Sequence, residues 1–398
     1  MSEKYLLFIT DFINLRAVIE GSKDILKELN KSFKNFIIVN SENIKFLSKE
    51  KNYNLNLFSD EFKYFNPLTK LEFKRFAKDK KIIAINHFGR DYGTLGVHIT
   101  LKSLGIKQIM ISKVGNIQMS DLRDWRYFFL SIKSFFKREF YKKFIFFLMI
   151  INFLPRIEIR FISNNLIIRD IRLNFFKNFI YKNKLFYAKE LISVNSRTYD
   201  FFLENKKEIS EDYIVHLDAS LNYIEETDLR GHLNQNILEK HYFFLKRFLE
   251  KLSKVYKKEV IVCIHPSYNL NEHKFFLKGF NVFQFKTREY ICKSFIITNF
   301  RSSAVCDGVF LKKKILGLIS NLMTKNEIEQ VKSLSNRIGY LNLNLETDYD
   351  FDLDNLLIRM KNKINNYHNY INSFHLVDRN ISGNKKIVEI IKDRFSFN

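Results

Sequence analysis

The chain has 398 residues, which is too long for one ordinary domain and fits two domains of moderate size. Hydrophobic residues make up 46% of it, enough to bury real cores, so the composition excludes wholesale disorder. The 66 Lys and Arg exceed the 43 Asp and Glu, and the formal charge of +23 indicates either a polyanionic partner or a solvated basic surface.

The cysteines and the N-terminal residues indicate the cellular compartment in which the protein is expected to lie. Cys263, Cys292 and Cys306 fall inside apolar segments and lack metal-ligand spacing, as expected of buried thiols in a reducing environment. The N-terminal segment MSEKYLLFITDF lacks the basic region and the long apolar run of a signal peptide. These features predict a cytoplasmic protein.

The N-terminal half, residues 1–205, alternates strand-like and helix-like segments. Apolar runs separated by helices indicate a parallel, doubly wound sheet, so this half predicts a first Rossmann-like domain that would bind the acceptor. Strands are expected over 4–10, 35–40, 81–86 and 107–112, with helices over about 16–30 and near 93–104.

Residues 121–156 interrupt this alternation with interleaved aromatic and basic side chains. Their longest nearly uninterrupted apolar stretch, 144–154, is shorter than the roughly 20 residues that a transmembrane helix needs. The segment fits a helix lying in a membrane interface, with cations at the headgroups and aromatic rings deeper. It fits equally well a buried helix pair whose basic residues face outward.

In residues 206–345, strand-like and helix-like segments alternate more regularly. This alternation predicts a second Rossmann-like domain, which would bind the donor. Strands are expected over 212–218, 259–265, 281–285, 294–299, 314–319 and 338–343, with helices at 236–256, 271–278, 287–293, 302–312 and 324–335. Residues 346–398 add a long amphipathic pattern, 353–373, and a last helix, 384–394. Two Rossmann-like domains with C-terminal helices packing across them describe the α/β architecture called GT-B.

Two adjacent serines follow the predicted strand 294–299, where the next helix is expected to begin. Ser302 and Ser303 would add hydroxyls to the unpaired N–H groups of a helix N-terminus, and such a place favours a phosphate anion. The alternative is a plain N-cap, which contributes about 1 kcal/mol to helix stability. One serine suffices for a cap, so the pair favours phosphate binding.

Other polar residues follow neighbouring strands at the same predicted edge, where parallel sheets bind ligands. His265 closes an apolar strand, Pro266 stops that strand, and the imidazole could donate to a phosphate or protonate a leaving group. Asp218 ends the preceding strand. Glu289 begins a helix near the place of ribose contacts in GT-B enzymes, although the helix dipole also favours an acidic residue there. All four residues are candidates for donor binding, and His265 also for catalysis.

The segments IHPS and FIITNFRSSAVCDGVFLKKKIL resemble the paired His-Pro and Ser-Ser motifs of bacterial sialyltransferases and related GT-B enzymes. They are also similar to the pattern of the CDP-glycerol polymerases of wall and capsule synthesis. In those families the histidine and the serines contact the phosphate of a CMP or CDP donor, which implies this role for His265, Ser302 and Ser303. The chain departs from the polymerases at Asn299, where they commonly have Asp, and in KKKIL, which replaces Lys-Pro.

The remaining motifs concern cofactors and the catalytic base. No G-x-G-x-x-G or P-loop occurs and no D-x-D triplet occupies a strand end, so neither an organic cofactor nor a metal is expected. An inverting transferase needs a base for the acceptor hydroxyl, which GT-B enzymes supply from the N-terminal domain. Asp91, close to His87, is the first candidate and Asp11 the second, with Glu20 farther on. Both aspartates could instead be helix N-caps.

Three hypotheses follow. The first is a metal-independent glycosyltransferase that uses a CMP-linked sialic-acid- or Kdo-type sugar to build a bacterial capsule polysaccharide or lipopolysaccharide. It would act on a glycan or lipid-linked glycan at the inner face of the plasma membrane. The second is a CDP-glycerol-type glycerophosphotransferase. The third is a non-catalytic membrane- or nucleic-acid-binding protein, but no recognised nucleic-acid module occurs, so nucleic acid is not expected as a partner.

Overall fold

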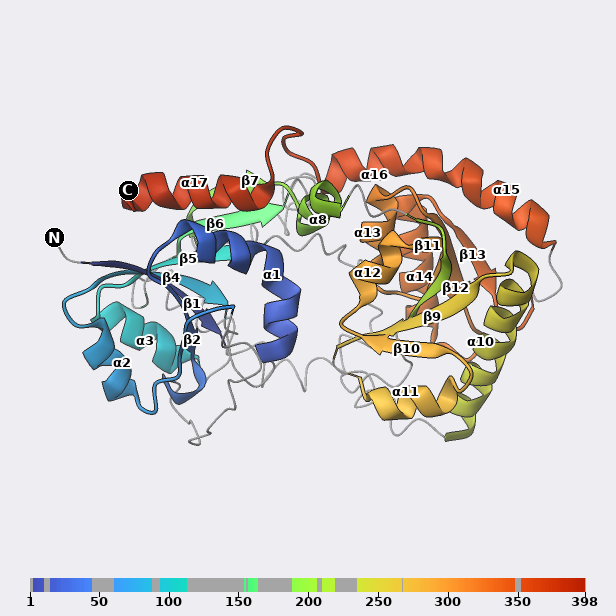
Figure 1. Cartoon of the computed structure of the whole chain (residues 1–398), viewed down its shortest axis with the longest axis horizontal. Helices are drawn as coiled ribbons and strands as arrows, with labels where there is room; N and C mark the ends of the chain where they lie inside the picture. The colour runs from blue at the N-terminus through green and yellow to red at the C-terminus, as the bar shows by residue number, and fades with distance from the viewer. Residues whose placement is uncertain are drawn as a thin grey trace. The chain divides into compact units, whose positions relative to one another are not determined.

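The computed structural model describes residues 3–10, 15–44, 61–87, 94–112, 154, 157–163, 188–205, 210–218, 235–266, 268–347 and 352–397. These residues form two compact units. The first consists of the described residues up to Arg197 together with residues 376–397, and the second is Thr198–His375. Each unit is built on one parallel sheet (Figure 1).

The described strands of the first unit form a seven-stranded sheet in the order β3-β2-β1-β4-β5-β6-β7. They are β1 (Lys4–Thr10), β2 (Phe36–Asn40), β3 (Tyr64–Phe65), β4 (Lys81–His87), β5 (Lys107–Ser112), β6 (Ile157–Ser163) and β7 (Ala188–Val194). The helical segments are α1 (Leu15–Ser32), η2 (Glu42–Ile44), α2 (Lys70–Ala77), α3 (Leu95–Ser103) and, from the end of the chain, α17 (Gly383–Phe395).

Apolar residues cover both faces of this first sheet, because successive side chains of a strand point to opposite faces. Leu6 and Phe8 of β1 pack in one cluster with α1 and α17, while Leu7 and Ile9 pack in another with α2 and α3. Helix α17 therefore completes the core of the first unit, although it follows the whole second unit in the chain (Figure 1).

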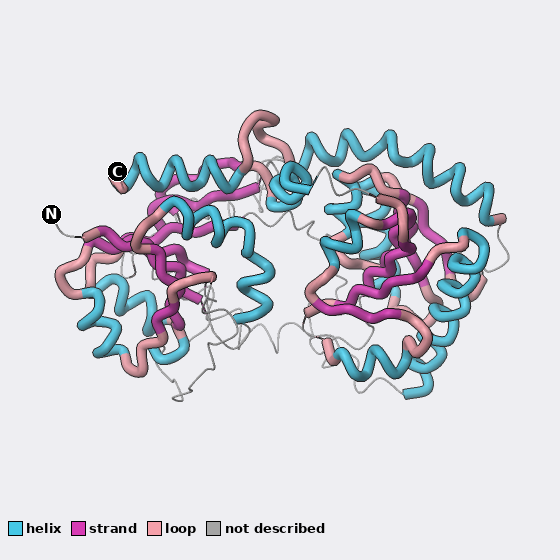
Figure 2. The backbone as a smooth tube through the Cα atoms, in the orientation of Figure 1, coloured by secondary structure: helices cyan, strands magenta, loops and turns pink. Residues whose placement is uncertain are grey.

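The described strands of the second unit form a six-stranded sheet in the order β10-β9-β8-β11-β12-β13. They are β8 (Tyr213–Asp218), β9 (Glu259–Ile264), β10 (Asn281–Gln284), β11 (Ser294–Asn299), β12 (Lys314–Ile319) and β13 (Leu341–Asn344). The helices are α8 (Arg197–Asn205), α10 (Gln235–Tyr256), α11 (Leu270–Phe276), α12 (Thr287–Cys292), α13 (Val305–Phe310), α14 (Lys325–Ile338), α15 (Leu353–Lys363), η5 (Ile364–Asn366) and α16 (Tyr367–Phe374). Helices lie on both faces of the strands (Figure 2).

The order of the second sheet contains a topological switch point. The chain runs outward from β8 through β9 to β10 and then returns to place β11 on the other side of β8. The carboxyl edge at such a switch point is where open α/β sheets bind ligands.

The predicted fold class, two Rossmann-like α/β domains, is confirmed. Four predicted strands, 4–10, 107–112, 294–299 and 314–319, coincide with β1, β5, β11 and β12. The C-terminal helices divide between the units, since α15 and α16 pack on the second unit and α17 on the first. The predicted domain limits, 1–205 and 206–345, do not include this return of the chain to the first unit.

Several predicted elements differ from the observed ones. The predicted strand 338–343 begins later, because α14 runs through Ile338 and ends at Gly339 in the left-handed region with φ of 96°. The predicted helix 302–312 is only Val305–Phe310, and the pattern 353–373 is broken by η5. The elements that had not been predicted are β3, α2, β6, β7 and α8.

The basic-aromatic segment 121–156 lies outside the described residues apart from Leu154, which is buried. Its predicted membrane-facing helix therefore stays a prediction. Across the described ranges, no helix combines the length and the apolar character that crossing a membrane would require.

Candidate functional site

The carboxyl ends of β9, β8 and β11 lie side by side at the switch point of the second sheet. Asp218 pairs with Ile264 and Leu217 pairs with Asn299, so the three strands end almost level with one another. His265 follows β9 directly and the turn 299–303 follows β11. The structure thus brings the two predicted phosphate motifs to one sheet edge, on the strands that flank β8.

Side-chain contacts made by its own residues fix the conformation of the turn 299–303. Asn299 Oδ1 accepts a hydrogen bond from the backbone N–H of Ser302 at 2.8 Å, and its Nδ2 donates to the Tyr340 hydroxyl at 3.3 Å. Phe300 is completely buried, and Arg301 lies 3.5 Å from the buried carboxylate of Glu327. A turn anchored at three consecutive residues presents its remaining groups in one defined geometry.

The two serines differ in their surroundings. Ser302 Oγ accepts a hydrogen bond from the backbone N–H of Ala304 at 3.3 Å, a local turn contact typical of serine. Ser303 is exposed, and its hydroxyl makes no hydrogen bond with any described residue. Neither serine caps α13, which begins at Val305 after Ala304 and has six residues. Ser302 therefore stabilises the turn, while Ser303 has a hydroxyl open to a ligand.

His265 and Pro266 are exposed on the neighbouring turn, which Gln284 at the end of β10 holds in place. Gln284 Nε2 donates to the carbonyl oxygens of Pro266 at 2.9 Å and of Tyr268 at 3.0 Å. Partial burial lowers the pKa of His265, so its imidazole is neutral at pH 7. A neutral imidazole still has one N–H that can donate to a phosphate oxygen.

Asp218 lies beneath this edge rather than on it, since only 3% of it is exposed. Tyr242 donates to Asp218 Oδ2 at 3.1 Å, His273 Nε2 lies 3.3 Å from the same oxygen, and His216 Nε2 lies 3.7 Å from Oδ1. Burial acts to raise the pKa of Asp218, but the neighbouring imidazoles of His216, His273 and His241 lower it overall. The structure therefore places Asp218 among buried side chains and not on the exposed edge.

A third histidine and an aromatic ring complete the buried cluster under the turn. The His241 ring lies 5.1 Å from the ring of Phe300, and His216 meets the same phenyl ring at 5.4 Å, edge to face. Burial lowers the pKa of His241 to about 4, which keeps this imidazole neutral. The cluster thus links the turn 299–303 to the core of the sheet.

Sequence reasoning had not singled out His216, His241, His273, Tyr242 or Gln284. The available signal was a polar residue at a core position. His216 interrupts the apolar run of β8, and His241 lies between Leu238 and Leu245 on the buried stripe of α10. A polar side chain at such a position costs burial energy unless it is bonded, so it marks a place that sequence reasoning could have flagged.

Glu289 has a local partner, because its carboxylate lies 3.1 Å from Nζ of Lys293, the residue that follows α12. The proposed bases Asp91 and Asp11 lie outside the described residues. Glu20 is partly buried on α1, away from any ion pair with a described residue. No described His, Cys, Asp or Glu side chains form a group of three or more that could hold a metal ion.

The carboxyl edge of the first sheet carries a small pocket of about 80 Å³. His87, the last residue of β4, lines it together with Phe8, Ile111 and Arg197. The His87 ring lies 4.9 Å from the Phe8 ring, and its Nδ1 is 3.3 Å from the Thr10 hydroxyl. This pocket places a titratable ring at the edge where β1 and β4 end, and the two base candidates follow these strands in the sequence.

No known family profile and no curated protein matches the sequence. Solved structures do match the fold. Staphylococcus aureus MnaA, in a co-structure with UDP, has a TM-score of 0.54 and 11% identity, covering 100% of this chain and 98% of that one. A putative UDP-N-acetylglucosamine 2-epimerase from Listeria monocytogenes has a TM-score of 0.51 and 12% identity, again covering 100% and 98%. At such low identity the likeness establishes the fold: the chain has the GT-B fold, with two Rossmann-like domains.

Proposed function

We propose that the protein is a glycosyltransferase that takes its sugar from a nucleotide-activated donor and holds the donor phosphate at the carboxyl edge of the second sheet. The observation that carries this proposal is the pair of exposed side chains, His265 and Ser303, in the turns that follow β9 and β11, the two strands that flank β8. Each belongs to a turn that buried or bonded neighbours hold in place.

The chemistry at this edge would be the stabilisation of a leaving phosphate. The His265 imidazole N–H and the Ser303 hydroxyl would donate to phosphate oxygens, and such preorganised donors stabilise charge that develops in the transition state. His265 could also protonate the leaving group. We further propose that the reaction needs neither an organic cofactor nor a metal. The base that deprotonates the acceptor would be Asp91, or else Asp11, in the first unit.

The motif resemblances favour a CMP-linked sugar of the sialic-acid or Kdo type as the donor. The product would be a bacterial capsule polysaccharide or lipopolysaccharide, made by a cytoplasmic enzyme peripheral on the inner membrane face. The segment 121–156 would provide the contact with the anionic membrane. Replacing Phe146, Phe147 and Leu148 by polar residues should then release the protein from anionic vesicles without unfolding it.

A second candidate is a protein that uses a UDP-sugar. The observation that favours it is the fold likeness to MnaA, which was solved with UDP, and to a putative UDP-N-acetylglucosamine 2-epimerase. A CDP-glycerol-type glycerophosphotransferase has less support. The polymerases commonly carry Asp at the position of Asn299, whose amide here bridges Ser302 and the Tyr340 hydroxyl.

Calorimetric titration of the wild-type protein with CMP, CDP and UDP tests the proposal and separates the candidates. We expect saturable binding of one of these nucleotides, followed by release of that nucleotide from its sugar conjugate when an acceptor glycan is supplied. Tight binding of UDP with no affinity for CMP would transfer the assignment to the second candidate. Failure to bind any of the three would reject the transferase and favour a non-catalytic binding protein.

A further inference from the structure

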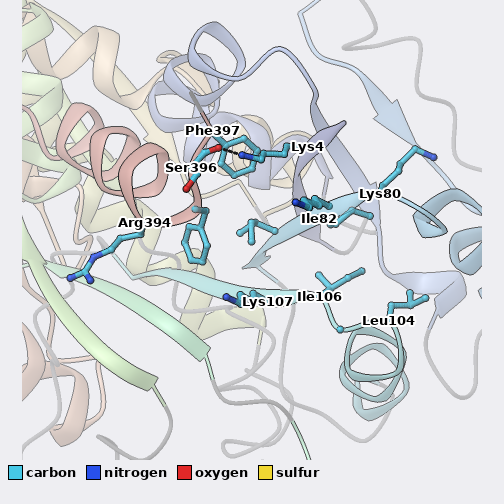
Figure 3. A pocket seen from close by; sticks show the side chains of 13 residues that line it. Lys4, Lys80, Ile82, Leu104, Ile106, Lys107, Arg394, Ser396 and Phe397 are labelled. Atoms are coloured by element: carbon cyan, nitrogen blue, oxygen red, sulfur yellow. Dashed lines mark hydrogen bonds between the residues drawn. The ribbon is translucent and has the colours of Figure 1, made fainter. Parts of the chain in front are cut away.

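A pocket of about 440 Å³ opens at the amino edge of the first sheet (Figure 3). The starts of β1, β4 and β5 line it, together with the end of α17. Five cationic side chains belong to the lining, and no acidic one does: Lys4, Lys80, Lys81, Lys107 and Arg394. Neither the sequence motifs nor the fold assigns a ligand to this edge.

The strand register explains why these cations meet. Lys4 pairs with Lys81 across β1 and β4, and Ile83 pairs with Lys107 across β4 and β5. All three strands run parallel, so they begin at the same edge. The helix end approaches this edge as well, because Lys4 Nζ donates to the carbonyl oxygen of Ser396 (Figure 3).

The five cationic side chains differ in their contacts with other described residues. Arg394 pairs with Glu190 at 3.1 Å, and Lys80 lies over the Phe76 ring at 4.5 Å. Lys81 and Lys107 are exposed, and neither side chain has a hydrogen-bond or ion-pair partner among the described residues. Neighbouring like charges repel one another, and an anion between them would remove that repulsion.

The rest of the lining is apolar. Ile82 and Ile106 are 7% and 5% exposed, and Phe397 also lines the pocket (Figure 3). The volume lies within the range of about 300–1,000 Å³ that is common for small-molecule sites. The pocket therefore combines donors for an anionic group with apolar surface for the remainder of its ligand.

We propose that this pocket binds a phosphate-bearing molecule, with Lys81 and Lys107 donating to the phosphate oxygens. Two sources share this chemistry, the headgroup of an anionic phospholipid and a soluble phosphate ester. The site is independent of the proposed sugar transfer. The seven-residue strands β1 and β4 put roughly 20 Å between this amino edge and the carboxyl edge of the same sheet.

The test compares two double variants with the same net charge. Lys81→Gln/Lys107→Gln removes the pocket donors, while Lys240→Gln/Lys254→Gln removes two exposed lysines of α10 in the second unit. Co-sedimentation with phosphatidylcholine vesicles, with and without phosphatidylglycerol, measures headgroup binding. Calorimetric titration with inorganic phosphate and with glycerol 3-phosphate measures binding of a soluble ester.

We expect the pocket variant to bind at least roughly tenfold more weakly than wild type, and the control variant to stay close to wild type. If the specific loss occurs only on phosphatidylglycerol vesicles, the ligand is a lipid headgroup. If it occurs with the soluble phosphates, the ligand is a soluble ester. Equal losses in both variants would mean diffuse charge attraction and would overturn the proposal, as would the absence of binding in both assays.

Discussion

The Tyr242 hydroxyl donates a hydrogen bond to the Asp218 carboxylate across 3.1 Å, and both side chains are almost completely buried. Tyr242 comes from α10 and Asp218 from the end of β8, so the bond ties a long helix to a central strand of the second sheet. His273 lies 3.3 Å from the same carboxylate oxygen. The carboxylate thus accepts from Tyr242 and lies close to His273, next to the end of the strand at the candidate phosphate site.

Asp218→Ala should therefore destabilise the protein strongly. Removing one partner of a buried charged group typically costs about 3–5 kcal/mol, because the other polar groups stay buried without an acceptor. Tyr242→Phe should cost less, about 1 kcal/mol, since the ring keeps its stack on Phe276 at 4.9 Å. Urea denaturation measures both. A stable Asp218→Ala protein that no longer binds nucleotide would show instead that Asp218 contacts the donor directly.

Stability should fall in mild acid because of two buried histidines. Burial lowers the pKa of both His241 and His375 to about 4, against about 6.5 in an unfolded chain. The unfolded state therefore binds more protons between these values, and stability is lost as the pH falls from about 6.5 toward 4. Each histidine should contribute about 2–3 kcal/mol to the loss at pH 4.5.

Denaturation curves recorded at pH 7 and pH 4.5 measure this dependence. His241→Leu should reduce the difference between the two curves, while His368→Gln, at an exposed position of α16, should leave it unchanged. An identical pH dependence in wild type and His241→Leu would contradict the assignment.

The donor phosphate site predicts a separation between affinity and stability. His265→Ala and Ser303→Ala should each weaken binding of the preferred nucleotide roughly tenfold, because a hydrogen bond to a charged group contributes about 1.5–3 kcal/mol. Ser302→Ala should mainly lower the melting temperature, since its hydroxyl accepts from Ala304.

Ser382 provides a matched control for these serine variants. It caps α17 by accepting from the backbone N–H of Lys385, so Ser382→Ala should cost about 1 kcal/mol of stability without changing affinity. If both His265→Ala and Ser303→Ala bind the nucleotide with wild-type affinity, the carboxyl edge of the second sheet does not bind the donor phosphate. The transferase proposal would then lose its main support.

Gln284 should affect nucleotide binding without touching the nucleotide. Its amide donates to the carbonyl oxygens of Pro266 and Tyr268, so Gln284→Glu would place an acceptor against acceptors and loosen the turn that carries His265. We expect a loss of affinity larger than in Gln284→Ala, together with reduced stability. Calorimetry and thermal denaturation of the two variants measure this. Equal nucleotide affinities in wild type and Gln284→Glu would show that the turn does not depend on the hydrogen bonds of Gln284.

Asp91→Asn tests the proposed base. The amide keeps the shape of the carboxyl group but cannot take up the proton from the hydroxyl of the acceptor glycan. Turnover should therefore fall by orders of magnitude while nucleotide binding persists. The measurement pairs a transfer assay with calorimetry on the same preparation. Near-normal turnover would move the role to Asp11 or Glu20, whose Asn and Gln variants are the next to compare.

Local sequence was enough to predict much of the fold. The segments that became β1, β5, β11 and β12 were predicted with their observed bounds, because each contains a run of at least two consecutive apolar residues, as a strand buried in a parallel sheet requires. Two of the strands that were missed are less buried or shorter. In β7, at the edge of its sheet, five central residues are not fully buried, and β3 has only two residues.

Which residues come together at each site depends on the tertiary structure. His265 and Ser303 could be placed at one edge in advance, since parallel strands end on the same side. The gathering of His216, His241 and His273 around Asp218 could not, because it depends on how α10 and α11 pack over the sheet. Lys4, Lys81 and Lys107 likewise meet only through the pairing of β1, β4 and β5, and such register depends on long-range packing that no local segment encodes.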